Sequence, residues 1–241
     1  MTEGFRPLSR LGTVYDWLRR SLWDVVPRDQ RDTPAALRRR QVVTVAVVLI
    51  GAGVLGYSLR IEPGSPTFYV STMVLAGVWV VGAFASGRLH LGRITRGEAH
   101  LRPVVAPLTL GLALVALFVA GSLVVRQIEP LADYVSSVLA YADEGSVPVL
   151  VVITLINGIA EELFFRGAAY AAIPRNPVAW TTLAYFVATL ATGNVMLAFA
   201  AILIGLVCGL QRRASGGVLA PIITHCTWSL SMLLVLPLFF R

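Results

Sequence analysis

Long apolar stretches, separated by short polar segments, follow one another from residue 42 to the end of the chain. Most of them reach the length of about 20 residues that an α-helix needs to cross a bilayer. The pattern predicts an all-α fold, a polytopic membrane helical bundle of about seven transmembrane helices, and leaves an eighth helix or a re-entrant segment open. The predicted spans are 42–59, 67–86, 104–125, 147–173, 177–192, 195–211 and 217–240.

The first 41 residues differ from the rest, because they combine nine arginines with five acidic residues. The apolar positions among them that recur at helical spacing are Leu11, Val14, Tyr15, Leu18, Leu22 and Val25. This spacing favours a short amphipathic helix on the membrane surface. A disordered basic tail is the alternative, since Pro27 and Pro34 interrupt the segment.

Composition places the chain among membrane proteins. Hydrophobic residues make up 56% of the sequence, charged residues 14%, and the mean hydropathy is +0.75, whereas soluble domains are far more polar. The formal net charge of +7 comes with arginine as the sole basic residue type. These arginines gather in the tail and in alternate loops. That distribution is typical of residues that set membrane topology, and not of a nucleic-acid-binding surface. We therefore expect lipid, and no nucleic acid, as a partner.

The loops give the expected orientation in the cell membrane. Segment 87–103 is rich in arginine, whereas 126–146 is an acidic loop, so the positive-inside rule puts the first inside and the second outside. The N-terminus is then cytoplasmic, and the first span is an uncleaved anchor. The expected divisions are a basic N-terminal segment 1–41, N-terminal transmembrane helices 42–146 and a C-terminal core 147–241.

The span 147–173 carries three ionisable residues, Glu161, Glu162 and Arg166. Each costs at least about 2.5 to 3.5 kcal/mol at mid-membrane, so a compensating role is expected. Glu162 and Arg166 are four residues apart and can pair on one helix face. Glu161 lies about 100° away, on the face of Asn157, where it suits a general base. The alternative is a buried salt-bridged cluster that only fixes helix packing.

Two further spans carry polar residues at helical spacing. His225 and Ser229 share one face of the last span, and Tyr185 and Thr189 share one face of the span 177–192. We expect these faces to converge with Glu161 on one cavity open to the cytoplasmic side. Thr189 has a plainer interpretation as well, because threonines in membrane helices commonly donate to the backbone carbonyl one turn back.

The segment Glu161-Glu162-Leu-Phe-Phe-Arg166-Gly167 resembles the EExxxRG motif of the CAAX prenyl endopeptidase and bacteriocin-processing family of intramembrane proteases. His225-Cys-Thr-Trp-Ser229 resembles its HxxxN motif, with Ser229 in place of Asn. Tyr185-Phe-Val-Ala-Thr189 stands at the FxxxH motif, with Thr189 in place of His. The resemblance covers roughly residues 147 to 232.

The resemblance implies a catalytic set of Glu161, Glu162, Arg166, His225 and Ser229. Glu161 would be the base, Glu162 would pair with Arg166, and His225 with Ser229 would stabilise the oxyanion. Asn157, Tyr185 and Thr189 would line the substrate site. Family analogy admits zinc, but a threonine hydroxyl is a poor ligand beside imidazole or carboxylate. We therefore expect no metal and no cofactor.

Three functions are open at this stage. The first is an endopeptidase that cleaves membrane-bound peptides or protein C-termini by a metal-independent route. The second is a catalytically silent relative that binds a membrane peptide or partner in the same groove, because the second-motif His is missing. The third is a small proton-coupled transporter, against which the absence of an internal repeat argues.

Overall fold

The computed structural model describes residues 10–96 and 99–240, with the backbone alone at residues 10–13 and 95–100. The part of the predicted basic N-terminal segment that covers residues 1–9 lies outside the described residues. Helices dominate the described chain, as the apolar pattern predicted. In chain order they are α1 (Arg10–Leu22), α2 (Pro34–Ser58), α3 (Pro66–Ser86), α4 (Val105–Val125), α5 (Glu129–Asp143), α6 (Val147–Glu162), η1 (Leu163–Ala169), α7 (Tyr170–Ala172), α8 (Pro177–Leu190), α9 (Val195–Ser215), α10 (Leu219–Val235) and α11 (Pro237–Phe240).

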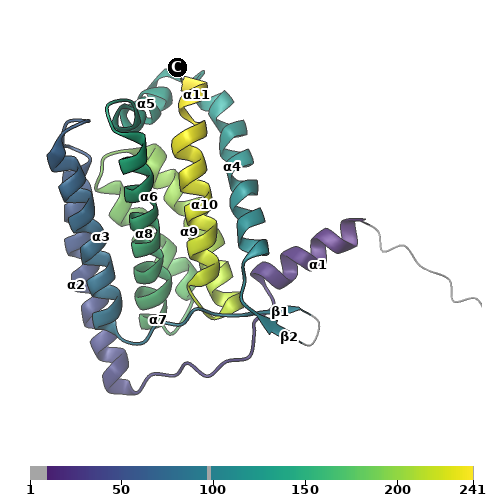
Figure 1. Ribbon diagram of the computed structural model, residues 1–241. Helices are drawn as coiled ribbons and strands as arrows, with labels where there is room; N and C mark the ends of the chain where they lie inside the picture. The colour runs from purple at the N-terminus through teal and green to yellow at the C-terminus, as the bar shows by residue number, and fades with distance from the viewer. Residues whose placement is uncertain (1–9, 97–98, 241) are drawn as a thin grey trace, which may run out of the picture.

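Six helices of the described residues are long and apolar enough to cross a membrane: Pro34–Ser58, Pro66–Ser86, Val105–Val125, Val147–Ala172, Val195–Ser215 and Leu219–Phe240. The shorter apolar helix α8 stands with them in the bundle (Figure 1). Together they account for the predicted fold of about seven transmembrane helices. The span predicted at 147–173 is one continuous rod made of α6, the π-helix η1 and α7.

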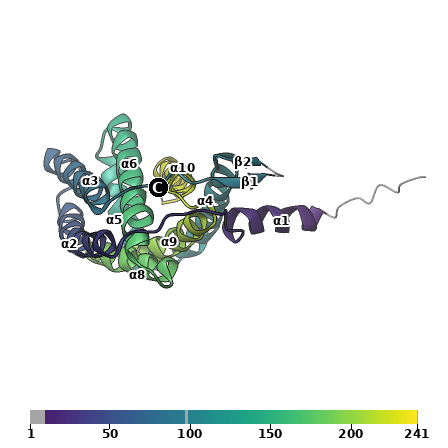
Figure 2. The same ribbon diagram turned by 90° about the horizontal axis from the view of Figure 1, so that it is seen from below.

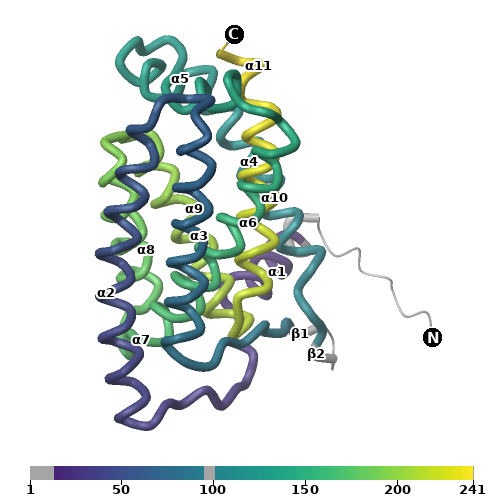
Figure 3. The backbone as a smooth tube through the Cα atoms, turned by 60° about the vertical axis from the view of Figure 1, so that its left-hand side comes forward, coloured from purple at the N-terminus to yellow at the C-terminus, as the bar shows by residue number. Residues whose placement is uncertain are grey.

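The predicted acidic loop 126–146 is wrong in part, because it contains the helix α5. This helix lies across one end of the bundle, above the other helices in Figures 1 and 3. Pro130 starts it at a favourable position, and its apolar residues Val135 and Leu139 are buried at helical spacing. The segment was interpreted from its acidic residues alone, so the helical spacing of its apolar residues was missed.

The opposite end of the bundle carries α1 and a two-stranded antiparallel hairpin, β1 (Ile94–Arg96) and β2 (Ala99–Leu101). The hairpin lies within the segment 87–103, which was expected to be a loop. Seen from below in Figure 2, α1 runs sideways out of the bundle beside α4 and α9. The amphipathic helix predicted in the N-terminal segment is thus present, and it ends before Val25.

Aromatic packing fixes the π-helix against its neighbours. The rings of Trp79 on α3 and Phe164 on η1 stack with centroids 4.9 Å apart, and Phe164 and Phe165 are both fully buried. Fully buried aromatic side chains contribute much of the energy of such a core. The rod of α6 and η1 is therefore held rigidly between α3, α8 and α10, where its charged residues lie.

Candidate functional site

The ionisable residues of the EExxxRG motif lie where an α-helix changes into a π-helix. Glu162 ends α6, and Arg166 belongs to η1. A π-helical turn is bonded from residue i to i+5 and leaves backbone groups to be satisfied from outside. Arg212 on α9 supplies such a partner, since its Nε donates to the backbone carbonyl of Arg166 over 2.7 Å. The irregular turn is thus bound to a neighbouring helix.

Glu162 lies at the centre of a dry ionic cluster. Its Oε1 accepts from Arg166 Nη1 over 3.0 Å and contacts His225 Nδ1 at 2.8 Å. The side chains of Glu162 and Arg166 are completely buried, and His225 is 6% exposed. The predicted pairing of Glu162 with Arg166 is confirmed, and His225 is a second partner of Glu162. Since a carboxylate accepts only, His225 Nδ1 carries the hydrogen, and its Nε2 stays free for another group.

Glu161 has a different environment, one residue away. Its Oε2 accepts a hydrogen bond of 2.6 Å from the hydroxyl of Tyr185 on α8. Glu161, Tyr185 and Thr189 line one cavity of about 140 Å³, together with Leu55 and Thr192 among others. The structure therefore confirms that Glu161 and the polar stripe of the span 177–192 converge.

Tyr185 connects the two acidic residues. The guanidinium carbon of Arg166 lies 5.0 Å from the centroid of the Tyr185 ring, within cation–π range. The rings of Tyr185 and His225 have centroids 6.5 Å apart. Arg166 and His225 are therefore both packed near the Tyr185 ring, whose hydroxyl reaches Glu161.

Thr189, at the position of the family's second-motif His, lines the cavity but keeps its hydroxyl within its own helix. The hydroxyl donates to the backbone carbonyl of Tyr185 over 2.8 Å. This is the plainer interpretation given above, and it leaves the oxygen's lone pairs toward the cavity.

Ser229 and Asn157 lie outside the Glu161 cavity. The hydroxyl of Ser229 makes a long contact of 3.4 Å with the Cys226 carbonyl, and Ser229 lines a second cavity of about 300 Å³ with Thr154. Asn157 donates to the Ile153 carbonyl. The expectation of one cavity for the whole set is therefore wrong, because Ser229 lines a separate cavity. Trp228 lines both cavities, as do Leu197 and Ala200.

His225 and Ser229 nevertheless face the same point of α6, as their spacing predicted. A Cβ placed on Gly158 would lie 3.8 Å from Ser229 Oγ and 4.0 Å from His225 Cδ2. Those are ordinary van der Waals distances, so Gly158 faces the side chains of both residues where α10 packs on α6.

The cavities lie toward the α5 end of the bundle, whereas the arginine-rich end was expected. Thr192 lines the Glu161 cavity and also a polar cavity of about 420 Å³ beneath α5, beside Arg60 and Tyr141. Asn194, which starts α9, ties α5 down, because its Nδ2 donates to the Tyr134 carbonyl over 2.7 Å. Helix α5 thus covers the approach to the site from that end.

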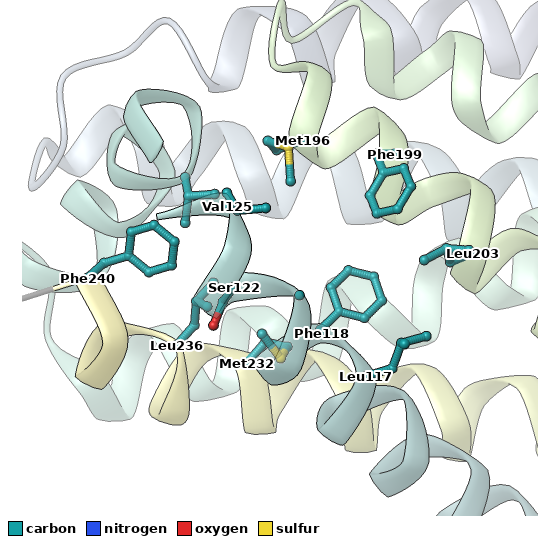
Figure 4. A pocket seen from close by; sticks show the side chains of 12 residues that line it. Leu117, Phe118, Ser122, Val125, Met196, Phe199, Leu203, Met232, Leu236 and Phe240 are labelled. Carbon is teal, nitrogen blue, oxygen red and sulfur yellow. The ribbon is translucent and has the colours of Figure 1, made fainter. Parts of the chain in front are cut away.

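An almost wholly apolar cavity of about 360 Å³ lies on the other side, between α4, α9, α10 and α11. In the close view of Figure 4 the rings of Phe118, Phe199 and Phe240 face it, with Met196 and Met232. Phe118, Met196 and Met232 also line the Ser229 cavity. The apolar cavity and the Ser229 cavity therefore lie side by side.

The donor set at this site does not fit a metal ion. Among the residues that the structure describes, no group of three or more His, Cys, Asp or Glu side chains could hold one. Oε1 of Glu162 is bonded to both Arg166 and His225, and the Thr189 hydroxyl donates elsewhere. Glu161 and the free nitrogen of His225 are then too few strong ligands.

Three features of the site were missed from the sequence: the π-helix, the separation of the Ser229 cavity from the Glu161 cavity and the bond from Arg212. Trp228 directly precedes Ser229 in the motif, and a bulky aromatic residue beside a polar position is a signal that could have indicated the separation. Arg212 is only 4% exposed. Nothing in its local sequence distinguishes it from Arg213.

The comparisons with known proteins agree with the motifs. The family model described as Type II CAAX prenyl endopeptidase Rce1-like matches residues 143–231. This stretch runs from the end of α5 into α10 and contains every predicted site residue. The resemblance inferred from the motifs is thus confirmed for this part of the chain. No curated protein and no solved structure matches the chain.

Proposed function

We propose that the chain, whose residues 143–231 carry the pattern of CAAX prenyl endopeptidases, is an endopeptidase of the cell membrane that cleaves membrane-associated peptides or protein C-termini. The observation that supports this most is the division of labour between neighbouring acids. Glu162 is neutralised by Arg166, while Glu161 faces a cavity with a single neutral hydrogen-bond partner. A carboxylate with one free oxygen beside a small cavity suits a general base.

In the proposed reaction Glu161 takes a proton from a water molecule, whose oxygen attacks the scissile carbonyl carbon. His225 acts as the imidazolium: Glu162 accepts from its Nδ1–H, and its Nε2–H donates to the oxyanion that forms. Collapse of the tetrahedral intermediate breaks the C–N bond, and Glu161 returns its proton to the leaving amine. Every step uses groups of this chain, so we propose a metal-independent route.

The proposed topology has the N-terminus in the cytoplasm. The arginine-rich end of the bundle, with α1 and the hairpin, is then inside, and the acidic helix α5 is outside. Because the cavities lie beneath α5, water would reach Glu161 from the outer side through the polar cavity that shares Thr192. The apolar cavity of Figure 4 would receive a hydrophobic segment of the substrate.

One observation favours a second candidate, a catalytically silent relative that binds a membrane peptide. The Thr189 hydroxyl donates to the Tyr185 carbonyl, so it offers no proton to the cavity in the way that an imidazole would. In that case the groove would hold its partner without cleaving it.

The test is cleavage of a quenched fluorescent library of membrane-anchored peptides by the purified protein. Wild type, Glu161→Gln and Thr189→His are compared, each with and without a chelator. We expect wild-type cleavage that survives the chelator and falls at least about a hundredfold in Glu161→Gln. An inactive wild type together with an active Thr189→His would instead identify the silent relative. Loss of wild-type activity in chelator would contradict the metal-independent route.

A further inference from the structure

A second site lies at the arginine-rich end of the bundle, remote from the acidic residues. Helix α1, the hairpin and the start of α4 enclose a cavity of about 450 Å³, lined by Trp17, Arg20, Ser21, Ile94, Leu101, Arg102, Val104, Val105 and Ala106. Its size is within the range of small-ligand pockets. The proposed endopeptidase mechanism uses none of these residues.

Helix α1 is held in place to form one wall of this cavity. Its residues Ser21 and Leu22 are buried, and α1 packs on α9, β1 and α4. Val14 and Tyr15, two turns earlier on the same face of the helix, are 55% and 65% exposed. Figure 1 shows the helix running away from the bundle at the level where α4 begins. An amphipathic helix at that level is suited to lie in the membrane interface.

Two guanidinium groups from separate elements enter the cavity. Arg20 donates from Nε to the Asp16 carbonyl, and Arg102 donates from Nη1 to the Gly92 carbonyl. Neither forms an ion pair with an acidic residue of the described chain, whereas the nearby Arg19 pairs with Asp24. The remaining N–H groups of Arg20 and Arg102 are available to an anion. Guanidinium groups bind phosphate in particular, because their planar fork matches two of its oxygens.

The other wall is apolar and continues into the membrane. Val104 and Val105 are 51% and 70% exposed where α4 begins its apolar span, and Leu101 is 46% exposed beside them. Trp17 also lines the cavity, and an amphipathic indole is favourable where apolar and polar surfaces meet. A ligand that fits has an anionic phosphate at one end and a hydrocarbon chain at the other.

We propose that this cavity binds one anionic phospholipid, with its phosphate between Arg20 and Arg102 and an acyl chain along Val104 and Val105. The bound lipid would fasten α1 to the start of α4. The site is independent of any peptidase activity, since it shares no residue with the cavities near Glu161.

The test uses the full chain purified in detergent and titrated with phosphatidylglycerol or with phosphatidylcholine of the same chains, with bound lipid counted by native mass spectrometry. We expect one phosphatidylglycerol to be retained on the wild type. The double variant Arg20→Gln, Arg102→Gln should bind it about thirtyfold more weakly. Both side chains are exposed, so the variant should keep the wild-type melting temperature in detergent without lipid.

The matched control is Arg31→Gln, Arg38→Gln, which removes the same charge from exposed positions of the same end of the bundle. It should bind phosphatidylglycerol like the wild type. Equal losses in the two double variants would overturn the proposal, since only the diffuse positive field would then attract the lipid. Competition by inorganic phosphate would overturn it too, because the acyl chain would then contribute nothing.

Discussion

Glu161 and Glu162 are neighbours in sequence, yet they lie in two different environments. Glu162 lies in a dry cluster between Arg166 and His225, with no exposed side-chain surface. Glu161 faces a cavity and has one described partner, the neutral hydroxyl of Tyr185. A successive pair on a helix points in directions about 100° apart, so one residue can stabilise the structure while the other stays available for chemistry.

The surroundings of the two glutamates explain how a membrane protein can keep the Glu161 carboxylate beside a cavity. Two carboxylates side by side repel each other, and each is costly in a membrane. Here Arg166 and His225 together face Glu162, and Arg166 also lies over the Tyr185 ring whose hydroxyl reaches Glu161. Arg166 thus balances the charge of Glu162, while the hydroxyl that reaches Glu161 is neutral.

The largest effect is expected when the dry cluster loses its cation. Arg166→Met should lower the free energy of unfolding by about 3–5 kcal/mol, because it leaves Glu162 buried with only His225 as partner. The measurement is the thermal denaturation midpoint in detergent, with folded yield by size-exclusion chromatography. Arg175→Met is the control, since Arg175 is exposed. If both variants melt like the wild type, the pair does not stabilise the fold.

A smaller effect is expected on the cavity side. Tyr185→Phe removes the hydroxyl that donates to Glu161 over 2.6 Å and keeps the ring beneath Arg166. It should lower the free energy of unfolding by about 1.5–3 kcal/mol, the usual range for a hydrogen bond to a charged group. Tyr57→Phe is the matched control, because Tyr57 is 59% exposed. A melting temperature as high as in that control would show that Glu161 does not depend on Tyr185.

The different environments of Glu161 and Glu162 could be predicted from the sequence only where they depend on residues nearby in the chain. The spacing of Glu162 and Arg166 predicts an ion pair between them along the helix, and the structure contains that ion pair. The contact of His225 with Glu162 depends on how α10 packs on α6, and the sequence indicated only that the two residues lie at similar depths. The π-helix at Leu163–Ala169 leaves no periodic signal in the residues.

The fold was predictable to a similar degree. Apolar length predicted the membrane helices, because crossing a bilayer sets a minimum length. It could not predict α5, whose apolar face is narrow and mixed with acidic residues, nor the end at which the cavities lie. The positive-inside rule orients the helices but says nothing of where their side chains leave space. The separation of that space into two cavities is a property of packing rather than of pattern.

The smallest change in stability is expected for Glu161→Gln. The amide keeps the shape of the side chain, and its oxygen can still accept from Tyr185, so the free energy of unfolding should change by at most about 1 kcal/mol. Glu162→Gln, its neighbour and control, should cost several times more, because Arg166 and His225 then lose their anion. Parallel melting curves of the two purified variants give the comparison. Equal destabilisation would mean that both glutamates stabilise the fold. The distinction on which the assignment of Glu161 as the base rests would then be lost.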